Sequence, residues 1–274
     1  MKNCTMVTLV SRFISLILII VLVKEQNDIG KAFFALAAGN LLAGCVGVIL
    51  LQHTIKLRFA ITDRNFIREI FTESGYVFTS IILVPLYSSV NIFILQALTN
   101  PFAVGSYSVA QKIFSAITML ASVINNTLFP YLTGLYADSV KKYKQTLHLI
   151  LPAIAGVFLL LCLVQFFGAK FIITLLAGEH SRDDISYAVQ ILKTMSVALF
   201  FSPFVSFFFQ QMIIQQQQKK LLRNIIIAVI VNLASASILG YYFSGVGMAI
   251  NFAVVYVVIC WLNGNAISKK LNYQ

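Results

Sequence analysis

The sequence predicts an all-α polytopic membrane protein with about eight transmembrane helices and both termini in the cytoplasm. Of its 274 residues, 59% are hydrophobic and only 11% are charged, and the mean hydropathy is +0.88. Ordinary soluble domains carry about 25% charged residues, so a soluble globular domain is excluded. Apolar stretches close to 20 residues long, the length at which an α-helix crosses about 30 Å of hydrocarbon, recur along the whole chain.

The apolar stretches give eight predicted spans. The first is a membrane span rather than a signal peptide, because Ser11 and Arg12 interrupt its apolar core and no small-residue cleavage site follows Val23. The segment 171–177 is too short to cross a bilayer, so it extends the fifth helix or lies at the membrane interface. The spans lie near residues 6–23, 32–51, 75–96, 106–129, 148–167, 187–212, 222–242 and 245–266.

The connections between the spans alternate in charge, and this predicts the orientation. With the N-terminus in the cytoplasm, 13 of the 20 Lys and Arg residues lie inside, four lie outside and three lie within spans. The positive-inside rule therefore favours both termini inside. The same rule explains most of the net charge of +11, so a nucleic-acid partner is not needed to account for it.

The longest polar connection, residues 52–73, is the predicted internal boundary. Charged and apolar residues alternate along it, which is typical of an amphipathic helix at the cytoplasmic membrane surface. It separates two spans in residues 1–51 from six spans in residues 74–274. A second connection contains the run Gln215–Gln218, which we interpret as a polar loop.

Three basic residues, Arg12, Lys112 and Lys193, lie inside the apolar stretches, whereas none of the nine Asp and Glu residues does. A charge at the centre of a membrane span costs about 3 kcal/mol on insertion scales, so such charges usually have a function. This asymmetry favours an intramembrane path for an anion. Arg12 and Lys193 lie close enough to their helix ends to reach the headgroups, so snorkelling explains them equally well.

Polar residues form a stripe on one face of the fourth span, at steps of three or four residues. The stripe extends over about 26 Å of helix. Ser and Thr residues alone would indicate close helix packing. A lysine and asparagines on the same line favour a water-lined cavity, or an anionic ligand, over packing alone. The stripe consists of Ser108, Lys112, Ser115, Thr118, Ser122 and Asn125, with Gln111 and Asn126 beside it.

The residues that catalysis would need are missing from the sequence pattern. The three histidines stand apart from one another, and the four cysteines form no C-x-x-C motif. No nucleophile with an adjacent base and no paired carboxylates lie within the spans. We therefore expect a binding or transport protein with no catalytic residues, no metal site and no cofactor. An exporter of organic cations is disfavoured, because such a cargo calls for intramembrane carboxylates.

Several segments resemble the bacterial O-antigen flippases of the multidrug/oligosaccharidyl-lipid/polysaccharide exporter superfamily. The stretch Val104–Ile113, with Leu128–Leu132 after it, is similar to the eighth span of these flippases. Ser74–Tyr87 is similar to their seventh span, and Gly245–Ala249 to the start of their last span. No single string is a strict signature, but order, spacing and topology agree along nearly the whole chain.

The resemblance implies a fold with two six-helix lobes around a central cavity. Residues 52–73 then correspond to the cytoplasmic link between the lobes, and 74–274 to a complete second lobe. Residues 1–51 correspond to two spans of the first lobe, so the chain would lack about four N-terminal spans.

The resemblance also implies a transporter that flips undecaprenyl-diphosphate-linked O-antigen or polysaccharide repeat units across the bacterial inner membrane. Its partners would be this lipid-linked oligosaccharide, membrane lipid, a polysaccharide polymerase and a chain-length regulator, with no nucleic acid. Lys112 would counter the diphosphate charge, supported by Arg12 and Lys193. A non-transporting or truncated component of a polysaccharide assembly complex is the alternative hypothesis.

Overall fold

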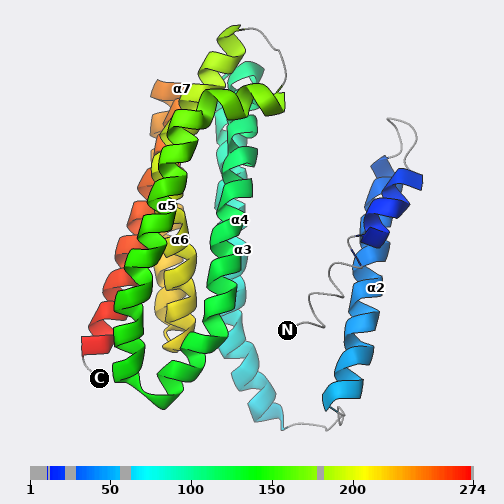
Figure 1. The fold of residues 1–274 in the computed structure, drawn as a ribbon, viewed down its shortest axis with the longest axis vertical. Coiled ribbons are helices and arrows are strands. Elements are labelled where there is room, and N and C mark those ends of the chain that lie inside the picture. Colours follow the sequence, from blue (N-terminus) through cyan, green and yellow to red (C-terminus); the bar gives the residue numbers. More distant parts are fainter. Residues whose placement is uncertain (1–10, 12, 22–28, 56–62, 178–181, 273–274) are drawn as a thin grey trace. The chain divides into compact units, whose positions relative to one another are not determined.

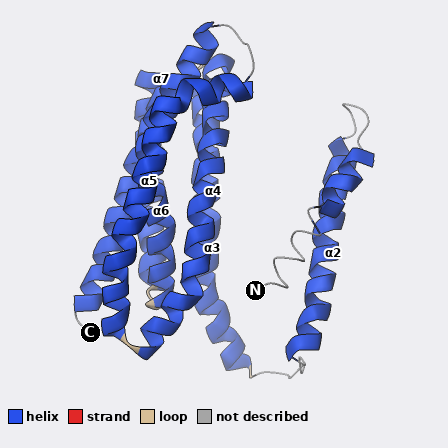
Figure 2. Ribbon diagram, in the orientation of Figure 1, coloured by secondary structure: helices blue, strands red, loops and turns tan. Residues whose placement is uncertain are grey.

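A computed structural model describes residues 11, 13–21, 29–55, 63–177 and 182–272. These residues are helical except at short turns, and none of them forms a strand (Figures 1 and 2). The all-α class expected from the sequence is therefore confirmed. The chain divides into two compact units, Met1–Arg64 and Asn65–Gln274.

The first unit contains a short helix at residues 13–21 and the helix α2 (Ile29–Ile55). Small residues bring the two helices together. The Ser11 hydroxyl donates a hydrogen bond of 2.7 Å to the carbonyl of Gly39. A Cβ on Gly39 would lie 1.8 Å from the Ser15 hydroxyl, so a larger residue there would displace the Ser15 side chain. Ser11 and Ser15 therefore serve helix packing. Arg12, which stands between them, lies outside the described residues.

The described residues of the second unit form five long helices, each long and apolar enough to cross a membrane. The helix α6 is its centre, because it contacts α4, α5 and α7. Leu192, Met195 and Leu199 on α6 have no exposed surface. The helices are α3 (Arg64–Leu98), α4 (Pro101–Asp138), α5 (Val140–Ala177), α6 (Arg182–Ile214) and α7 (Gln218–Asn272).

The outer surface of this unit is strongly apolar. Phe167 and Leu149 on α5 are 78% and 76% exposed, and Phe93 on α3 is 68% exposed. Soluble proteins rarely expose large contiguous apolar patches, because apolar surface in water costs free energy. The surface suits hydrocarbon, and the second unit is therefore a polytopic membrane bundle.

Local chemistry determines where the helices begin and end. At the α3–α4 turn, the Asn100 side chain accepts a hydrogen bond of 2.9 Å from the backbone N–H of Ala103, and Pro101 occupies the first helical position. Both choices favour a helix start. At the α4–α5 turn, Ser139 is extended, and its carbonyl accepts a 3.0 Å bond from Tyr143.

The helix α7 is a hairpin rather than one straight helix. Its backbone reverses at Ser244, where φ is 53° and ψ is −132°. Asn224 donates a 2.9 Å hydrogen bond to Asn263, and Asn251 donates a 2.8 Å bond to Asn232. These pairs show that the two arms are antiparallel. The arms, on either side of Ser244 in Gln218–Asn272, contain the two predicted spans 222–242 and 245–266.

The helix bounds also bear on two other predictions from the sequence. The segment 171–177 continues α5 to Ala177, which is one of the two placements expected for it. The second half of the connection 52–73 is helical and continuous with α3, which begins at Arg64, while residues 56–62 lie outside the described part.

The hairpin turn gives the first testable prediction. A Cβ on Gly247 would lie 1.9 Å from the carbonyl oxygen of Leu239, a backbone atom that cannot move aside cheaply. We expect Gly247→Ala to destabilise the protein by about 2 kcal/mol or more, measured by thermal denaturation in detergent. Gly156→Ala is the control, because a Cβ there meets nothing within 4 Å. Equal stability of the two variants would contradict the hairpin geometry.

Candidate functional site

A hollow of about 550 Å³ lies between α3 and α4 in the second unit. Four of its lining side chains belong to the polar stripe predicted on the fourth span or stand beside it. Its other walls are apolar and come from α3 and α4. The hollow is lined by Ile92, Ser108, Gln111, Lys112, Ser115, Ala116 and Met119. The three apolar members were not anticipated, because nothing in the sequence distinguishes them from lipid-facing residues.

The orientation of α4 brings these side chains into the hollow. On its opposite face Tyr107, Ala110 and Phe114 are buried in the core of the bundle. The ring of Phe114 contacts Phe252 at 5.8 Å between centroids. Residues three or four apart share a helix face, so burying this apolar face leaves Lys112 and Ser115 exposed. Helix periodicity and core packing thus place a cation in the hollow.

The ammonium group of Lys112 makes no hydrogen bond or ion pair with any residue in the described part of the chain. The hydroxyls of Ser108 and Ser115 and the amide of Gln111 line the same space. A lysine offers three donors and no acceptor, while hydroxyls and amides offer both. The hollow can therefore neutralise an anionic group and hydrogen-bond neighbouring hydroxyl groups.

Further along α4, two hydroxyl groups of the stripe hydrogen-bond their own helix. The hydroxyl of Thr118 donates to the Ser115 carbonyl at 2.9 Å, and that of Ser122 donates to the Met119 carbonyl at 2.7 Å. Both groups are thus satisfied within their own helix, a common arrangement for Ser and Thr in helices.

Asn125 and Asn126 bind the neighbouring helix α6. Asn125 is only 1% exposed, and its amide donates to the Pro203 carbonyl at 3.1 Å and to the Ser206 hydroxyl. Asn126 accepts a 2.9 Å bond from Gln210. Neither residue lines the hollow around Lys112. This part of the stripe contributes interhelical hydrogen bonds, the role that the packing interpretation assigns to polar residues.

Lys193 on α6 faces a different environment. Its ammonium lies 5.4 Å from the ring centroid of Phe166 on α5, within cation–π range. It does not line the hollow that contains Lys112. The structure therefore does not bring these two lysines into one site, and the third candidate, Arg12, lies outside the described residues.

A buried asparagine network links α3 to both arms of α7, and sequence reasoning did not identify it. Asn91 and Asn232 exchange hydrogen bonds of 2.8 and 3.2 Å, and Asn251 donates to Asn232 at 2.8 Å. All three residues have no exposed surface. The sequence does contain a signal for this network, namely asparagines within apolar stretches, because a side-chain amide in hydrocarbon needs a hydrogen-bond partner.

Within the described residues, no group of three or more His, Cys, Asp or Glu side chains could hold a metal ion. Cys45, Cys162 and Cys260 are free thiols scattered over separate helices.

Residues 1–136 match the family model described as "Polysaccharide biosynthesis protein". Two curated relatives carry the name "Putative O-antigen transporter". The protein of Escherichia coli (strain K12) is 25% identical over 206 residues, which are 74% of this chain and 46% of the relative. The protein of Shigella dysenteriae is 27% identical over 268 residues, 94% of this chain and 64% of the relative. The chain thus spans less than two thirds of the length of either relative.

Solved structures share the fold at low sequence identity. The MATE transporter VcmN of Vibrio cholerae in its bent form superimposes with a TM-score of 0.74 at 16% identity, covering 98% of this chain and 62% of its own. The lipid II flippase MurJ in an inward closed conformation gives a TM-score of 0.60 at 14% identity, covering 97% and 54%. Both similarities concern the fold alone.

The two roles along the stripe lead to a stability prediction. Asn125→Ala removes hydrogen bonds from α4 to α6, and such interhelical bonds in membranes contribute roughly 1 kcal/mol each. We expect a lower thermal denaturation temperature in detergent for Asn125→Ala. Ser115→Ala should keep the wild-type temperature, because Ser115 lines the hollow and is exposed. Equal losses in both variants would contradict this division of the stripe.

Proposed function

We propose that this chain, whose residues 1–136 match the polysaccharide biosynthesis protein family, flips undecaprenyl-diphosphate-linked O-antigen or polysaccharide repeat units from the inner to the outer leaflet of the bacterial inner membrane. The relatives and the family support a transporter rather than an enzyme. The proposed cargo is a lipid-linked oligosaccharide whose hydrocarbon tail stays in the bilayer while its diphosphate and sugars cross beside the helices.

The hollow around Lys112 is the observation that carries this proposal. An intramembrane cation without a carboxylate partner in the described residues is costly unless it meets water or an anion. A diphosphate supplies that anion, and a bond between ammonium and phosphate is charge-assisted and therefore strong. Ser108, Gln111 and Ser115 supply donors and acceptors for sugar hydroxyls. Thr118, Ser122, Arg12 and Lys193 are secondary candidates.

The distribution of basic residues supports the proposed orientation with both termini in the cytoplasm. One end of the second unit holds the α4–α5 turn, the α6–α7 turn and the C-terminal end of α7 (Figure 1). Hydrogen bonds from Tyr143 to Gln211 and from Lys144 to Asn272 tie these segments together. By the positive-inside rule this end lies in the cytoplasm. Its basic residues include Lys141, Lys142, Lys144, Lys219, Lys220, Arg223, Lys269 and Lys270.

The proposed topology has eight spans in two parts. The hairpin α7 supplies two spans and α3–α6 supply four, so residues 74–274 form a six-helix lobe. Residues 1–51 supply two spans of the other lobe, with 52–73 between them. A polysaccharide polymerase and a chain-length regulator are the proposed protein partners, since they use the flipped repeat unit.

Lys112 gives the direct test of this proposal. In a strain that lacks its O-antigen flippase, the chain should restore surface polysaccharide, and Lys112→Gln should lower it about tenfold or more, because charge-assisted hydrogen bonds contribute about 1.5–3 kcal/mol. Surface polysaccharide is measured by gel electrophoresis, at matched membrane levels of the two proteins.

Lys170→Gln is the matched control, since it removes the same charge from an exposed position on α5 that does not line the hollow, and it should keep most of the activity. Normal polysaccharide in the Lys112→Gln strain would refute the role of Lys112. A wild-type chain that fails to restore polysaccharide but co-purifies with the polymerase would instead favour a non-transporting component of the assembly complex.

A further inference from the structure

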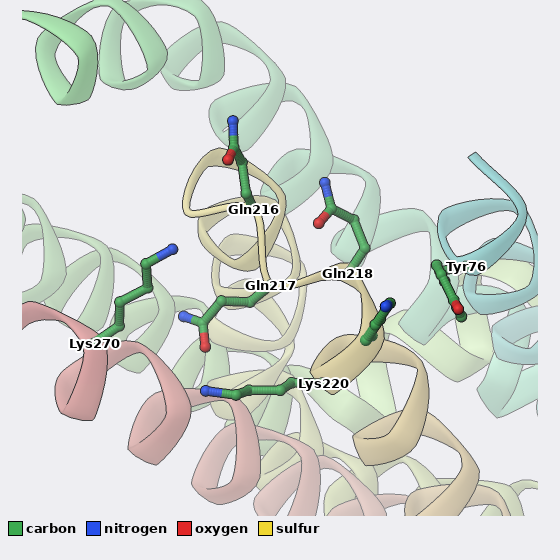
Figure 3. Close-up of a pocket in the computed structure, with 7 residues that line it drawn as sticks. Tyr76, Gln216, Gln217, Gln218, Lys220 and Lys270 are labelled. Carbon is green, nitrogen blue, oxygen red and sulfur yellow. The ribbon is translucent and has the colours of Figure 1, made fainter. Parts of the chain in front are cut away.

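A second hollow, of about 350 Å³, lies at the basic end of the second unit. It is formed by α3, the α6–α7 turn and both arms of α7. Its lining carries three lysines and no acidic residue (Figure 3). The lining residues are Tyr76, Gln216, Gln217, Gln218, Lys219, Lys220 and Lys270. None of them lines the hollow around Lys112.

The α6–α7 turn has a defined geometry that shapes this hollow. Gln217 N–H donates to the Met212 carbonyl at 2.8 Å, and Gln216 N–H donates to the Ile213 carbonyl at 2.9 Å, which together form a Schellman motif. Gln216 has a φ of 54°, in the left-handed region that favours glycine. The helix α7 then begins at Gln218. Its first N–H groups, which lack acceptors within the helix, point toward this end and favour an anion.

The three lysines come from different parts of the fold. The ammonium of Lys219 lies 5.7 Å from the ring centroid of Tyr76 on α3. Lys220 follows it on the first arm of α7, and Lys270 on the second arm donates a hydrogen bond to the Gln215 carbonyl. Like charges gathered around one small space repel one another, so an anion bound between these lysines would be favoured.

The side chain of Gln217 adds a hydrogen-bond acceptor that lacks a donor. Its side chain is only 6% exposed and, in Figure 3, lies between the side chains of Lys220 and Lys270. Its amide nitrogen donates to Gln215 at 2.8 Å, while its amide oxygen has no hydrogen-bond partner. A buried acceptor without a partner costs about 1–3 kcal/mol, so a rotation of the Gln217 amide that turns this oxygen toward a ligand hydroxyl in the hollow would be favoured.

We propose that this hollow binds a phosphate group that carries a neighbouring hydroxyl, as in the headgroup of an anionic glycerophospholipid such as phosphatidylglycerol. The lysines and the α7 N-terminus bind the phosphate, and the amide oxygen of Gln217 accepts the hydroxyl. Juxtamembrane clusters of basic residues attract anionic lipids. The site is separate from the proposed translocation path, and its ligand is not the proposed cargo.

Phosphate with a hydroxyl neighbour can reach this end of the protein from two sources. A lipid presents it at the membrane surface, and a small polyol phosphate presents it in solution. Both satisfy the same lysines and the same amide oxygen. The binding experiment therefore needs a lipid arm and a soluble arm.

Binding is measured on the full chain by native mass spectrometry with phosphatidylglycerol, phosphatidylmethanol and phosphatidylcholine, and by competition with glycerol 1-phosphate. We expect phosphatidylglycerol to bind most tightly, because phosphatidylmethanol lacks the hydroxyl and phosphatidylcholine has no net charge. Displacement by glycerol 1-phosphate would support the site with a soluble source, and retention of lipid in its presence would support the site with a lipid source.

Matched charge variants test the position of the site. Lys219→Gln with Lys220→Gln should weaken phosphatidylglycerol binding about tenfold or more, since each basic residue near an anionic lipid contributes measurably to affinity. Lys141→Gln with Lys142→Gln removes the same charge from an exposed pair at the same end of the unit, outside the hollow, and should leave binding within about twofold. Lys219→Arg with Lys220→Arg should retain binding.

Equal losses in the two double glutamine variants would overturn the proposal, because net charge alone would then explain lipid binding. Equal affinity for phosphatidylglycerol and phosphatidylmethanol would overturn the role assigned to Gln217. If the Lys219→Gln and Lys220→Gln protein does not fold, the arginine pair and the lipid comparison still decide the matter. The measurement involves no transport, so its outcome is independent of the proposed function.

Discussion

The lack of hydrogen-bonding partners in hydrocarbon is the constraint on which this structure depends. Backbone groups in a bilayer must be satisfied internally, which leaves helices as the solution for this chain. The same constraint acts on polar side chains. Asn91, Asn232 and Asn251 bond one another, and Asn125 bonds α6, so each has partners inside the bundle. The charged ammonium of Lys112 has no partner among the described residues, and for this reason it marks the candidate site.

The two hollows therefore differ in which of their polar groups lack a partner. Around Lys112 an unpartnered cation stands beside hydroxyls at membrane depth, which suits a polar cargo in passage. At the basic end, the hollow is lined by three lysines and no acidic residue. The amide oxygen of Gln217 there has no hydrogen-bond donor. The ligand proposed for each hollow carries phosphate, but one hollow lies within the apolar stretch and the other near the predicted membrane surface.

Much of the fold could be predicted from the sequence, because hydropathy reports span length directly. The polar stripe on α4 was visible for the same reason, since Ser108, Lys112 and Ser115 recur at helical steps. Which neighbour each stripe residue meets was not visible, because that depends on how α4 packs against α3 and α6. The run Gln215–Gln218 forms a polar turn, as its composition predicts. Its composition does not predict that tertiary contacts bury Gln215 and Gln217.

Water access to the hollow beside Lys112 is tested most directly by cysteine labelling in membranes. In a background without native cysteines, Ser115→Cys should react with a hydrophilic thiol reagent at least about tenfold faster than Ser237→Cys, because a thiol in hydrocarbon seldom forms the reactive thiolate. Ser237 is an exposed serine on the apolar surface of α7 and bonds only its own helix. Labelling of Ser115→Cys no faster than Ser237→Cys would contradict the account.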